Sequence, residues 1–370
     1  MSSQSIVSML PLPDGLKTLL LEKYVFSEPK SADKKSDAKE HKKEVVKSSA
    51  RKILGITPLK ECVGIINGKI RRDFKLCSKS TYADHIKNSR DLICTGMKGL
   101  KGNALGLGFG LIEQLDEIAN QFKKLTLIDY NLDSITPLCK GLPKLLRNKI
   151  EPKEFDLTKG FCELFEKLVN DLVKKVFAGE CTEKQFVDEI VAQYLKVAST
   201  EFTISGLAEL LIADGGIQSQ DYVISSCVMS QLDTHITNYV EEAFTTCFGS
   251  DRQNLFEKYE NYKPALFSMK NQLHINYLMG LHNIVKTTGI IYFADTTLLL
   301  ENQKVVTTVI THIGLSAIAK IFHIIESKTW IWNYDPKGSS FMVKAYLLKS
   351  KNLNLFFEEE MVRRMALTKA

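Results

Sequence analysis

The chain has 370 residues, of which 44% are hydrophobic and 25% charged, with a formal net charge of +6 and a pI of 8.7. This length suits one large domain with additions or two domains, and the composition is that of a soluble globular protein. Residues 28–52 alone carry nine basic against five acidic side chains, so the rest is almost neutral and the charge does not indicate a nucleic-acid-binding core.

Eight cysteines are spread along the sequence without a Cys-x-x-Cys pair or a histidine at ligand spacing. We therefore expect no metal site, and free thiols in a reducing compartment. No secretory leader is evident, which favours a cytoplasmic location. The longest apolar run, residues 305–325, is interrupted by Thr, His and Lys side chains, so we expect a buried amphipathic helix there and no membrane span.

Residues 1–52 form the first predicted unit, a mobile basic segment. Its second half, residues 28–52, has hardly any large apolar side chain and cannot bury enough surface to fold, so it predicts a linker. The lysines would also suit a tether to nucleic acid or to a membrane surface, but interspersed acids favour a solvated linker. The mixed pattern of residues 53–98 predicts a helical layer that leads into a sheet domain.

Residues 103–110, Asn-Ala-Leu-Gly-Leu-Gly-Phe-Gly, predict a strand at 103–108, a glycine-rich turn and a helix at 110–122. Glycines allow backbone conformations closed to other residues, and an anion or a nucleotide ribose can then lie on bare backbone at the helix start. Close packing of backbone alone would also explain them. A second strand at 125–129 ends in Asp129, about 20 residues on, where an acceptor for ribose hydroxyls is expected.

After the second strand, helices and strands continue to alternate until a longer helical stretch interrupts the alternation. We predict a helix near 134–147, a third strand within 149–158 that ends near Asp156, and a helical insertion at about 159–218. Such an insertion exceeds what a crossover requires, so it is either a lid or recognition element or a structural embellishment. A fourth strand at 221–228 precedes a second helical insertion at about 236–285 and a fifth strand at 289–295.

The C-terminal part predicts a helix near 302–326 and two strands at 329–334 and 340–348. Asp-Pro-Lys-Gly at 335–338 favours a tight turn between these strands, and hence an antiparallel hairpin. Residues 351–370 predict a charged tail with one short helix.

Five strands that alternate with helices and end in a hairpin resemble the class I S-adenosylmethionine-dependent methyltransferases, over about residues 99–350. The resemblance implies an α/β fold with a Rossmann-like methyltransferase sheet of five parallel strands plus a C-terminal antiparallel hairpin, a helical N-terminal layer and helical insertions. It also implies S-adenosyl-L-methionine as cofactor. The cofactor-binding residues it implies are Gly106, Gly108 and Gly110 for the methionine part, Asp129 for the ribose, Asp156 and Leu157 for the adenine, and Ser225 and Ser226 beside the substrate.

The same residues can be interpreted without the family. Asp129 and Asp156 would each suit a cap for the helix that follows, but an ordered set of polar residues at strand ends favours a ligand site. Tyr130 is a candidate to pack on the adenine, or else a core tyrosine. The family usually has an acid two positions before the first glycine of the motif, where this chain has Ala104, so an inactive relative is an open alternative. Nicotinamide enzymes need a further glycine where this chain has Leu111, which disfavours an oxidoreductase.

Methyl transfer depends mostly on positioning, and a base is needed only when the acceptor arrives protonated. Candidate catalytic residues near the fourth strand are Asp233 and His235, with Cys227 and Gln231 lining the site. His274 and His282 are interpreted as ordinary histidines because no third ligand has matching spacing.

Two functions follow as hypotheses. The first is methyl transfer to a protein or small-molecule acceptor; nucleic acid is disfavoured because the motifs of base methylation are missing. The second is a catalytically inactive, methyltransferase-like binding or scaffold module, such as a secreted bacterial effector. The run of glutamates at 358–360 beside Phe356 and Phe357 resembles type IV translocation tails, although a solvated terminal helix explains it equally well.

Overall fold

The computed structural model describes residues 79–108, 114–130, 132, 135–158, 160–199, 219–249, 252–301, 304–308, 312–333 and 339–352. The predicted basic segment, Gly110, the turn at 335–338 and the tail helix lie outside these ranges. The elements in chain order are α5 (Lys79–Gly96), β1 (Asn103–Leu107), α6 (Leu115–Gln121), β2 (Lys124–Asp129), α7 (Thr136–Lys140), α8 (Lys144–Arg147), β3 (Ile150–Glu154), α9 (Phe161–Phe177), α10 (Glu183–Ser199), β4 (Gln220–Ser226), α12 (Thr234–Phe248), α13 (Arg252–Lys258), α14 (Tyr262–Ile284), β5 (Val285–Glu301), β6 (Lys304–Thr308), α15 (His312–Ile321), β7 (Phe322–Asn333) and β8 (Ser339–Ser350).

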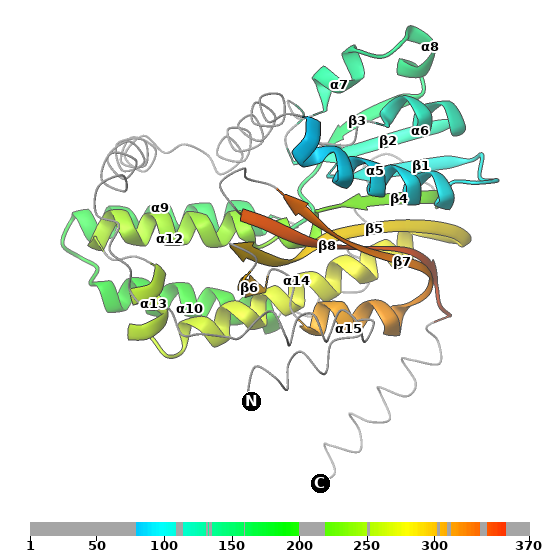
Figure 1. The fold of residues 1–370 in the computed structure, drawn as a ribbon. Helices are drawn as coiled ribbons and strands as arrows, with labels where there is room; N and C mark the ends of the chain where they lie inside the picture. The colour runs from blue at the N-terminus through cyan, green and yellow to red at the C-terminus, as the bar shows by residue number, and fades with distance from the viewer. Residues whose placement is uncertain are drawn as a thin grey trace.

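Within the described ranges, eight strands form one sheet in the order β3-β2-β1-β4-β5-β8-β7, and β6 pairs with β5 (Figure 1). The first five strands of that order are parallel to one another, whereas β8 is antiparallel to both β5 and β7. This arrangement confirms the predicted fold class, a Rossmann-like methyltransferase sheet closed by an antiparallel pair. Because all five parallel strands run the same way, their carboxyl ends lie along one edge of the sheet.

The prediction of a helix near 302–326 is confirmed at His312–Ile321 and wrong on both sides of it. Residues 304–308 form β6, which turns back on the end of β5, and residues 322–326 already belong to β7. Strand β5 is also longer than predicted, since it begins at Val285 and places Gly289 inside the strand. The sequence at both ends of the predicted helix is rich in Val, Thr and Ile, whose branched side chains favour strands.

The sheet is covered on both faces. Helices α14 and α15 pack on one face through a buried cluster that includes Leu107, Val223 and Phe293, and α5 and α6 pack on the other through Tyr222 and Tyr292 (Figure 1). Alternation along β4 and β5 decides which side chain faces which layer. Ser225 and Asp295 therefore share the α14 face with Val223 and Phe293.

A third cluster forms the core of a helical subdomain, which comprises α9, α10, α12, α13 and the first half of α14. It lies beyond the carboxyl ends of the parallel strands (Figure 1). Helix α14 joins the two parts, because Met269 and Leu273 belong to the subdomain core while Leu278 and Leu281 cover the sheet. Helix α14 therefore has buried side chains along its whole length, and it holds the subdomain against the ends of the strands.

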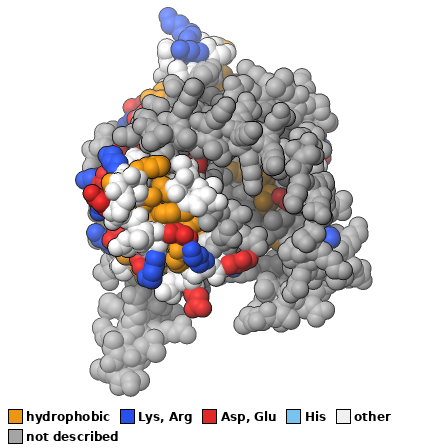
Figure 2. Space-filling model, turned by 90° about the vertical axis from the view of Figure 1, so that its left-hand side faces the viewer, with side chains coloured by type: hydrophobic (Ala, Val, Ile, Leu, Met, Phe, Trp, Pro, Cys, Tyr) orange, Lys and Arg blue, Asp and Glu red, His pale blue; other side chains and the backbone are white. Residues whose placement is uncertain are grey.

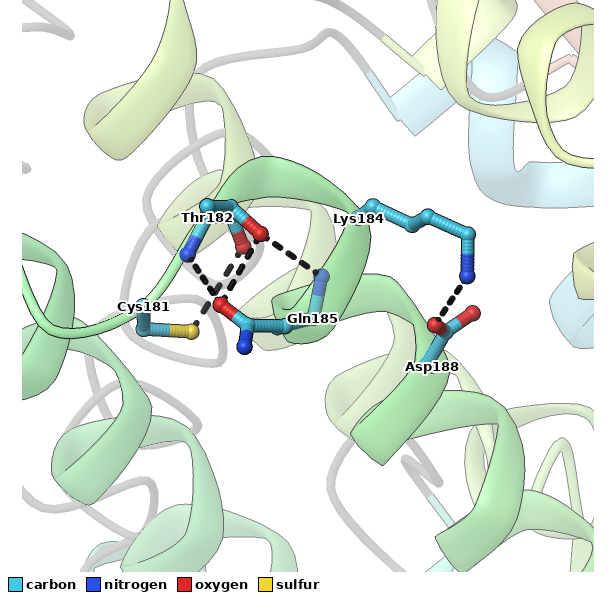
Figure 3. A network of polar contacts seen from close by, with 5 residues as sticks. All are labelled: Cys181, Thr182, Lys184, Gln185 and Asp188. Carbon is cyan, nitrogen blue, oxygen red and sulfur yellow. Dashed lines mark hydrogen bonds and ion pairs between the residues drawn. The ribbon is translucent and has the colours of Figure 1, made fainter.

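The subdomain helices are fixed by local chemistry as well as by packing. Thr182 and Gln185 form a reciprocal cap at the start of α10, in which Thr182 N donates to Gln185 Oε1 at 2.9 Å and Gln185 N donates to Thr182 Oγ1 at 3.3 Å (Figure 3). One turn later, Lys184 and Asp188 pair across the exposed face at i, i+4. The two contacts between Thr182 and Gln185 satisfy backbone N–H groups that have no partner within the helix.

The free end of the subdomain shows hydrophobic side chains surrounded by charged ones (Figure 2). Elsewhere in the subdomain as well, single apolar side chains are exposed: Phe177 at the end of α9 is 58% exposed, and Leu195 near the end of α10 is 49% exposed. Single exposed apolar residues are normal on protein surfaces, so this face does not favour the recognition interpretation of the insertion over the structural one.

His85 connects α5 to the reversed strand pair. Its Nδ1 accepts a hydrogen bond from Trp330 Nε1 at 3.0 Å, and its ring stacks on Trp332 with centroids 4.3 Å apart. Only 8% of the side chain is exposed, and burial lowers the pKa of His85 from 6.5 to about 4. The imidazole is therefore neutral at pH 7, as its acceptor role requires.

We expect this histidine to make folding stability depend on pH. Its contribution is complete above about pH 6.5 and is lost as the pH falls towards 4, since the unfolded chain binds a proton in that window and the folded chain does not. Between pH 7 and pH 5, the wild type should lose about 1–2 kcal/mol more unfolding free energy than His85→Asn, whose amide oxygen can still accept from Trp330 but does not titrate. Urea unfolding at both pH values measures this, and equal losses in the two proteins would contradict it.

Candidate functional site

Gly108 ends the first strand in a conformation that favours glycine. Its φ is +64°, and its N donates to Ile128 O at 3.2 Å. A Cβ at this position would lie 2.3 Å from Val228 Cγ2 and 3.3 Å from Ser226 O. The turn after β1 therefore packs against the loop after β4, and both the backbone conformation and this contact require glycine. Gly106 lies within β1 between Leu127 and Ile224 of the neighbouring strands.

Asp129 is the last residue of β2, at the carboxyl edge of the sheet next to the turn at Gly108. It is 8% exposed and lies in register with Glu154 of β3. Tyr130 follows it, is half-buried and packs against the subdomain core. Burial raises the pKa of the Tyr130 hydroxyl, which is therefore neutral. The strand order thus brings Asp129 beside Gly108, although their sequence separation is large.

Asp156 lies just beyond β3 and caps the turn into α9. Its Oδ1 accepts from Thr158 N at 2.7 Å and from Thr158 Oγ1 at 2.6 Å, and its Oδ2 accepts from Gly160 N at 2.8 Å. This is the geometry of the capping interpretation. Oδ2 accepts one bond and has further acceptor capacity, so the adenine role of Asp156 stays a prediction. Leu157 packs against the core on the α14 face of the sheet.

The end of β4 carries Ser225, Ser226 and Cys227. Ser225 is fully buried, and its Oγ lies 2.8 Å from the hydroxyl of Tyr277 on α14. Ser226 is partly exposed beside Gly108. Cys227 has a φ of +54°, unusual for a residue with a side chain, and its N donates to Ala294 O at 2.8 Å. Burial raises the pKa of Cys227, so its thiol is protonated at neutral pH and is a poor nucleophile.

Asp233, one of the two predicted catalytic residues, is at the start of α12 and fully buried. Its Oδ2 lies 2.5 Å from Lys270 Nζ and its Oδ1 lies 3.4 Å from His274 Nε2. Burial alone would raise the pKa of Asp233, but the contacts with His274 and Lys270 outweigh it and lower the pKa. The carboxylate is therefore ionised and engaged in a buried ion pair.

His235, the other predicted catalytic residue, follows in the first turn of α12 and is partly buried. Burial lowers the pKa of His235 to about 4, with a smaller opposing effect of Asp233. A neutral imidazole can accept a proton, so this environment permits a base without assigning one. Gln231, predicted to line the site, is exposed in the loop before α12.

The structure adds a stripe of polar residues that sequence reasoning missed. Lys270, His274 and Tyr277 of α14 follow one another at i, i+4 and i+7, so they share one helix face. That face reaches Asp233 of α12 and Ser225 of β4. The available signal in the sequence was the i, i+4 and i+7 spacing of these three polar residues.

Asp295 of β5 was also missed as a site residue. It is fully buried, its Oδ2 accepts from Ser230 N at 3.1 Å, and its Oδ1 accepts from Thr296 N at 2.8 Å. Burial raises the pKa of Asp295 to about 6, although the hydrogen bonds from Ser230 and Thr296 oppose this. An acid that ends an apolar pattern in a predicted strand was the signal in the sequence.

Within the described ranges, no group of three or more His, Cys, Asp or Glu side chains could hold a metal ion. Within the same part of the chain, no helix has both the length and the apolar character needed to cross a membrane.

No protein-family model matches the sequence, and no curated protein matches it. Among solved structures, the chain is similar to the N-methyltransferase NodS from Bradyrhizobium japonicum WM9 in complex with S-adenosyl-L-homocysteine, at 10% identity and a TM-score of 0.38, over 77% of this chain and 98% of that chain. It is also similar to the PH0226 protein from Pyrococcus horikoshii OT3, at 10% identity and a TM-score of 0.35, over 73% of this chain and 91% of that chain. A DhpI complex with S-adenosylhomocysteine is 9% identical, with a TM-score of 0.32 over 75% of this chain and 93% of that chain. Similarities at this level concern the fold and assign no cofactor, substrate or activity to this chain.

Proposed function

We propose that this chain is an S-adenosyl-L-methionine-dependent methyltransferase that transfers a methyl group to a protein or small-molecule acceptor. The observation that carries the proposal is the place of Asp129, a largely buried carboxylate at the carboxyl end of β2 beside the glycine turn of β1. A carboxylate there can accept hydrogen bonds from both hydroxyls of a ribose. Ligands of open α/β sheets lie at this edge.

The residues present fit a nucleoside cofactor. Gly106 and Gly108 would leave backbone close to its methionine part, Asp129 would hold the ribose, and Asp156 with Leu157 would meet the adenine. Tyr130 borders the same region from the subdomain side. Bound there, the cofactor would supply an electrophilic methyl group. The protein's own part is to hold the acceptor in line and to exclude water.

The two catalytic candidates, Asp233 and His235, differ in their ability to accept a proton. Asp233 is committed to Lys270, whereas the neutral ring of His235 can accept a proton. We therefore favour His235 over Asp233 as a base for acceptors that arrive protonated.

One observation favours a second candidate function, a binding or scaffold module without turnover. Ala104, where the family usually has an acid, is 1% exposed and packs in the core on the α5 face of the sheet. No carboxylate at that position can meet the cofactor's ammonium. The two candidates differ in whether cofactor binding is followed by turnover.

Calorimetric titration of the full chain tests the proposal. We expect micromolar binding of S-adenosylmethionine and of S-adenosylhomocysteine, with no heat from NAD. Methyl transfer from labelled cofactor to a protein or metabolite pool would then separate the enzyme from the scaffold. Absence of binding by a folded sample would refute the methyltransferase and leave a nucleotide-free scaffold, and binding of NAD alone would indicate an oxidoreductase.

A further inference from the structure

A buried carboxylate on β5 holds the loop that follows β4. This loop, residues 227–231, leaves the end of β4 and contains a short 3-10 turn at Met229–Gln231. Asp295 accepts the backbone N–H of Ser230 with one oxygen and that of Thr296 with the other, at 3.1 Å and 2.8 Å. Thr296 Oγ1 donates to Ser230 Oγ at 3.1 Å, which adds a second link between β5 and the loop.

The first residue of the loop is fixed by the same strand. Cys227 N donates to Ala294 O at 2.8 Å, one residue before Asp295, and Cys227 has a φ of +54°. A left-handed conformation at a residue with a side chain costs free energy, so it persists only where neighbouring contacts hold it. Ala294 O accepts from Cys227 itself, and Asp295 accepts from Ser230, three residues further along the loop.

The loop in turn contacts the glycine turn of β1. Val228 lies so close to Gly108 that a Cβ there would be 2.3 Å from Val228 Cγ2. Gly108 N also donates to Ile128 O, next to Asp129. A continuous series of contacts therefore runs from Asp295 through Ser230 and Val228 to Gly108.

We propose that Asp295 is a positioning residue, which holds the loop 227–231 and thereby sets the glycine turn at the ligand edge of the sheet. Asp295 is buried and would not touch a ligand, so it acts through Ser230 and Val228. Only the identity of the ligand rests on the proposed methyltransferase function.

The chemistry of the contacts requires a carboxylate. Asp295 accepts from two backbone N–H groups, those of Ser230 and Thr296, and also has a side-chain hydrogen bond with Ser230. A carboxylate is the side chain of this size with two acceptor oxygens. In Asp295→Asn, the amide NH2 must face one of these donors, whichever way the side chain turns. A buried donor then loses its acceptor, which loosens one end of the loop.

Hydrogen exchange of the Ser230 and Gly108 amides tests the proposal on the full chain. We expect Asp295→Asn to speed exchange at both amides at least tenfold and to raise the Kd of S-adenosylhomocysteine at least tenfold. Thr296→Val removes only the hydroxyl contact and should change the two exchange rates and the Kd by about threefold. This variant replaces Asp295→Asn if Asp295→Asn fails to fold. Asn170→Ala is the matched control, because it removes a buried hydrogen bond from Tyr239 in the helical subdomain, away from the loop.

Faster exchange at Ser230 and Gly108 in the Asp295 variant, with neither amide changed in Asn170→Ala, supports the positioning role. Unchanged exchange at Gly108 overturns it, as does an unchanged Kd where the wild type binds S-adenosylhomocysteine. If the wild type binds no S-adenosylhomocysteine but exchange changes as expected, the positioning role stands and the proposed cofactor is refuted.

Discussion

Asp129→Ala is expected to weaken binding of S-adenosylhomocysteine by about 100-fold or more. Two hydroxyl groups donating to one ionised carboxylate contribute about 1.5–3 kcal/mol each, and each 1.4 kcal/mol is tenfold in Kd. The effect should be this large because Asp129 is only 8% exposed, so little water replaces the lost acceptor. Calorimetric titration of both proteins measures it.

A remote carboxylate provides the control for Asp129. Asp171 of α9 is 53% exposed and pairs loosely with Lys174 at 3.8 Å. Asp171→Ala should bind S-adenosylhomocysteine as the wild type does. If Asp129→Ala lowered the affinity less than threefold, Asp129 would not hold the ribose and the capping interpretation of this residue would be favoured.

Asp233→Ala is expected to lower the free energy of unfolding by about 3–5 kcal/mol, because it leaves Lys270 buried without its partner. Side-chain exposure is 1% for Asp233 and 14% for Lys270, so water cannot replace the lost charge. The pKa of Asp233 is lowered, so the stabilisation is present above about pH 4 and is lost as the pH falls below it. Urea unfolding at pH 7 measures the loss.

Removal of both charges is the matched comparison. Asp233→Leu combined with Lys270→Met should recover most of the stability, since an apolar pair of similar volume avoids the cost of burying charge. A loss below about 1 kcal/mol in Asp233→Ala would contradict a structural ion pair. The double variant also separates stability from catalysis, because a restored fold without methyl transfer would indicate a chemical role for the Asp233–Lys270 pair.

The succession of strands along the chain and the glycine turn could be predicted from sequence, because their signals are local. Residues 103–107 and 124–129 alternate with helical patterns, and β1 and β2 occupy nearly the predicted positions. The turn sequence at 335–338 indicated the hairpin, and β7 and β8 are indeed antiparallel. The helix predicted near 302–326 formed only at His312–Ile321. On either side of it, residues that suit a strand as well became β6 and the start of β7, because pairing with β5 and β8 decided between the two structures.

In the candidate site, too, local features could be predicted from sequence and long-range contacts could not. The sequence alone determined which residue types end each strand, namely glycine after β1 and acids after β2 and β3, because these depend on backbone conformation and on neighbours in the chain. Only the tertiary structure decided that Asp233 pairs with Lys270 and that Asp295 holds the loop beside Gly108. Those contacts join residues by burial and strand order, and no periodicity in one segment encodes which distant partner will neutralise a buried charge.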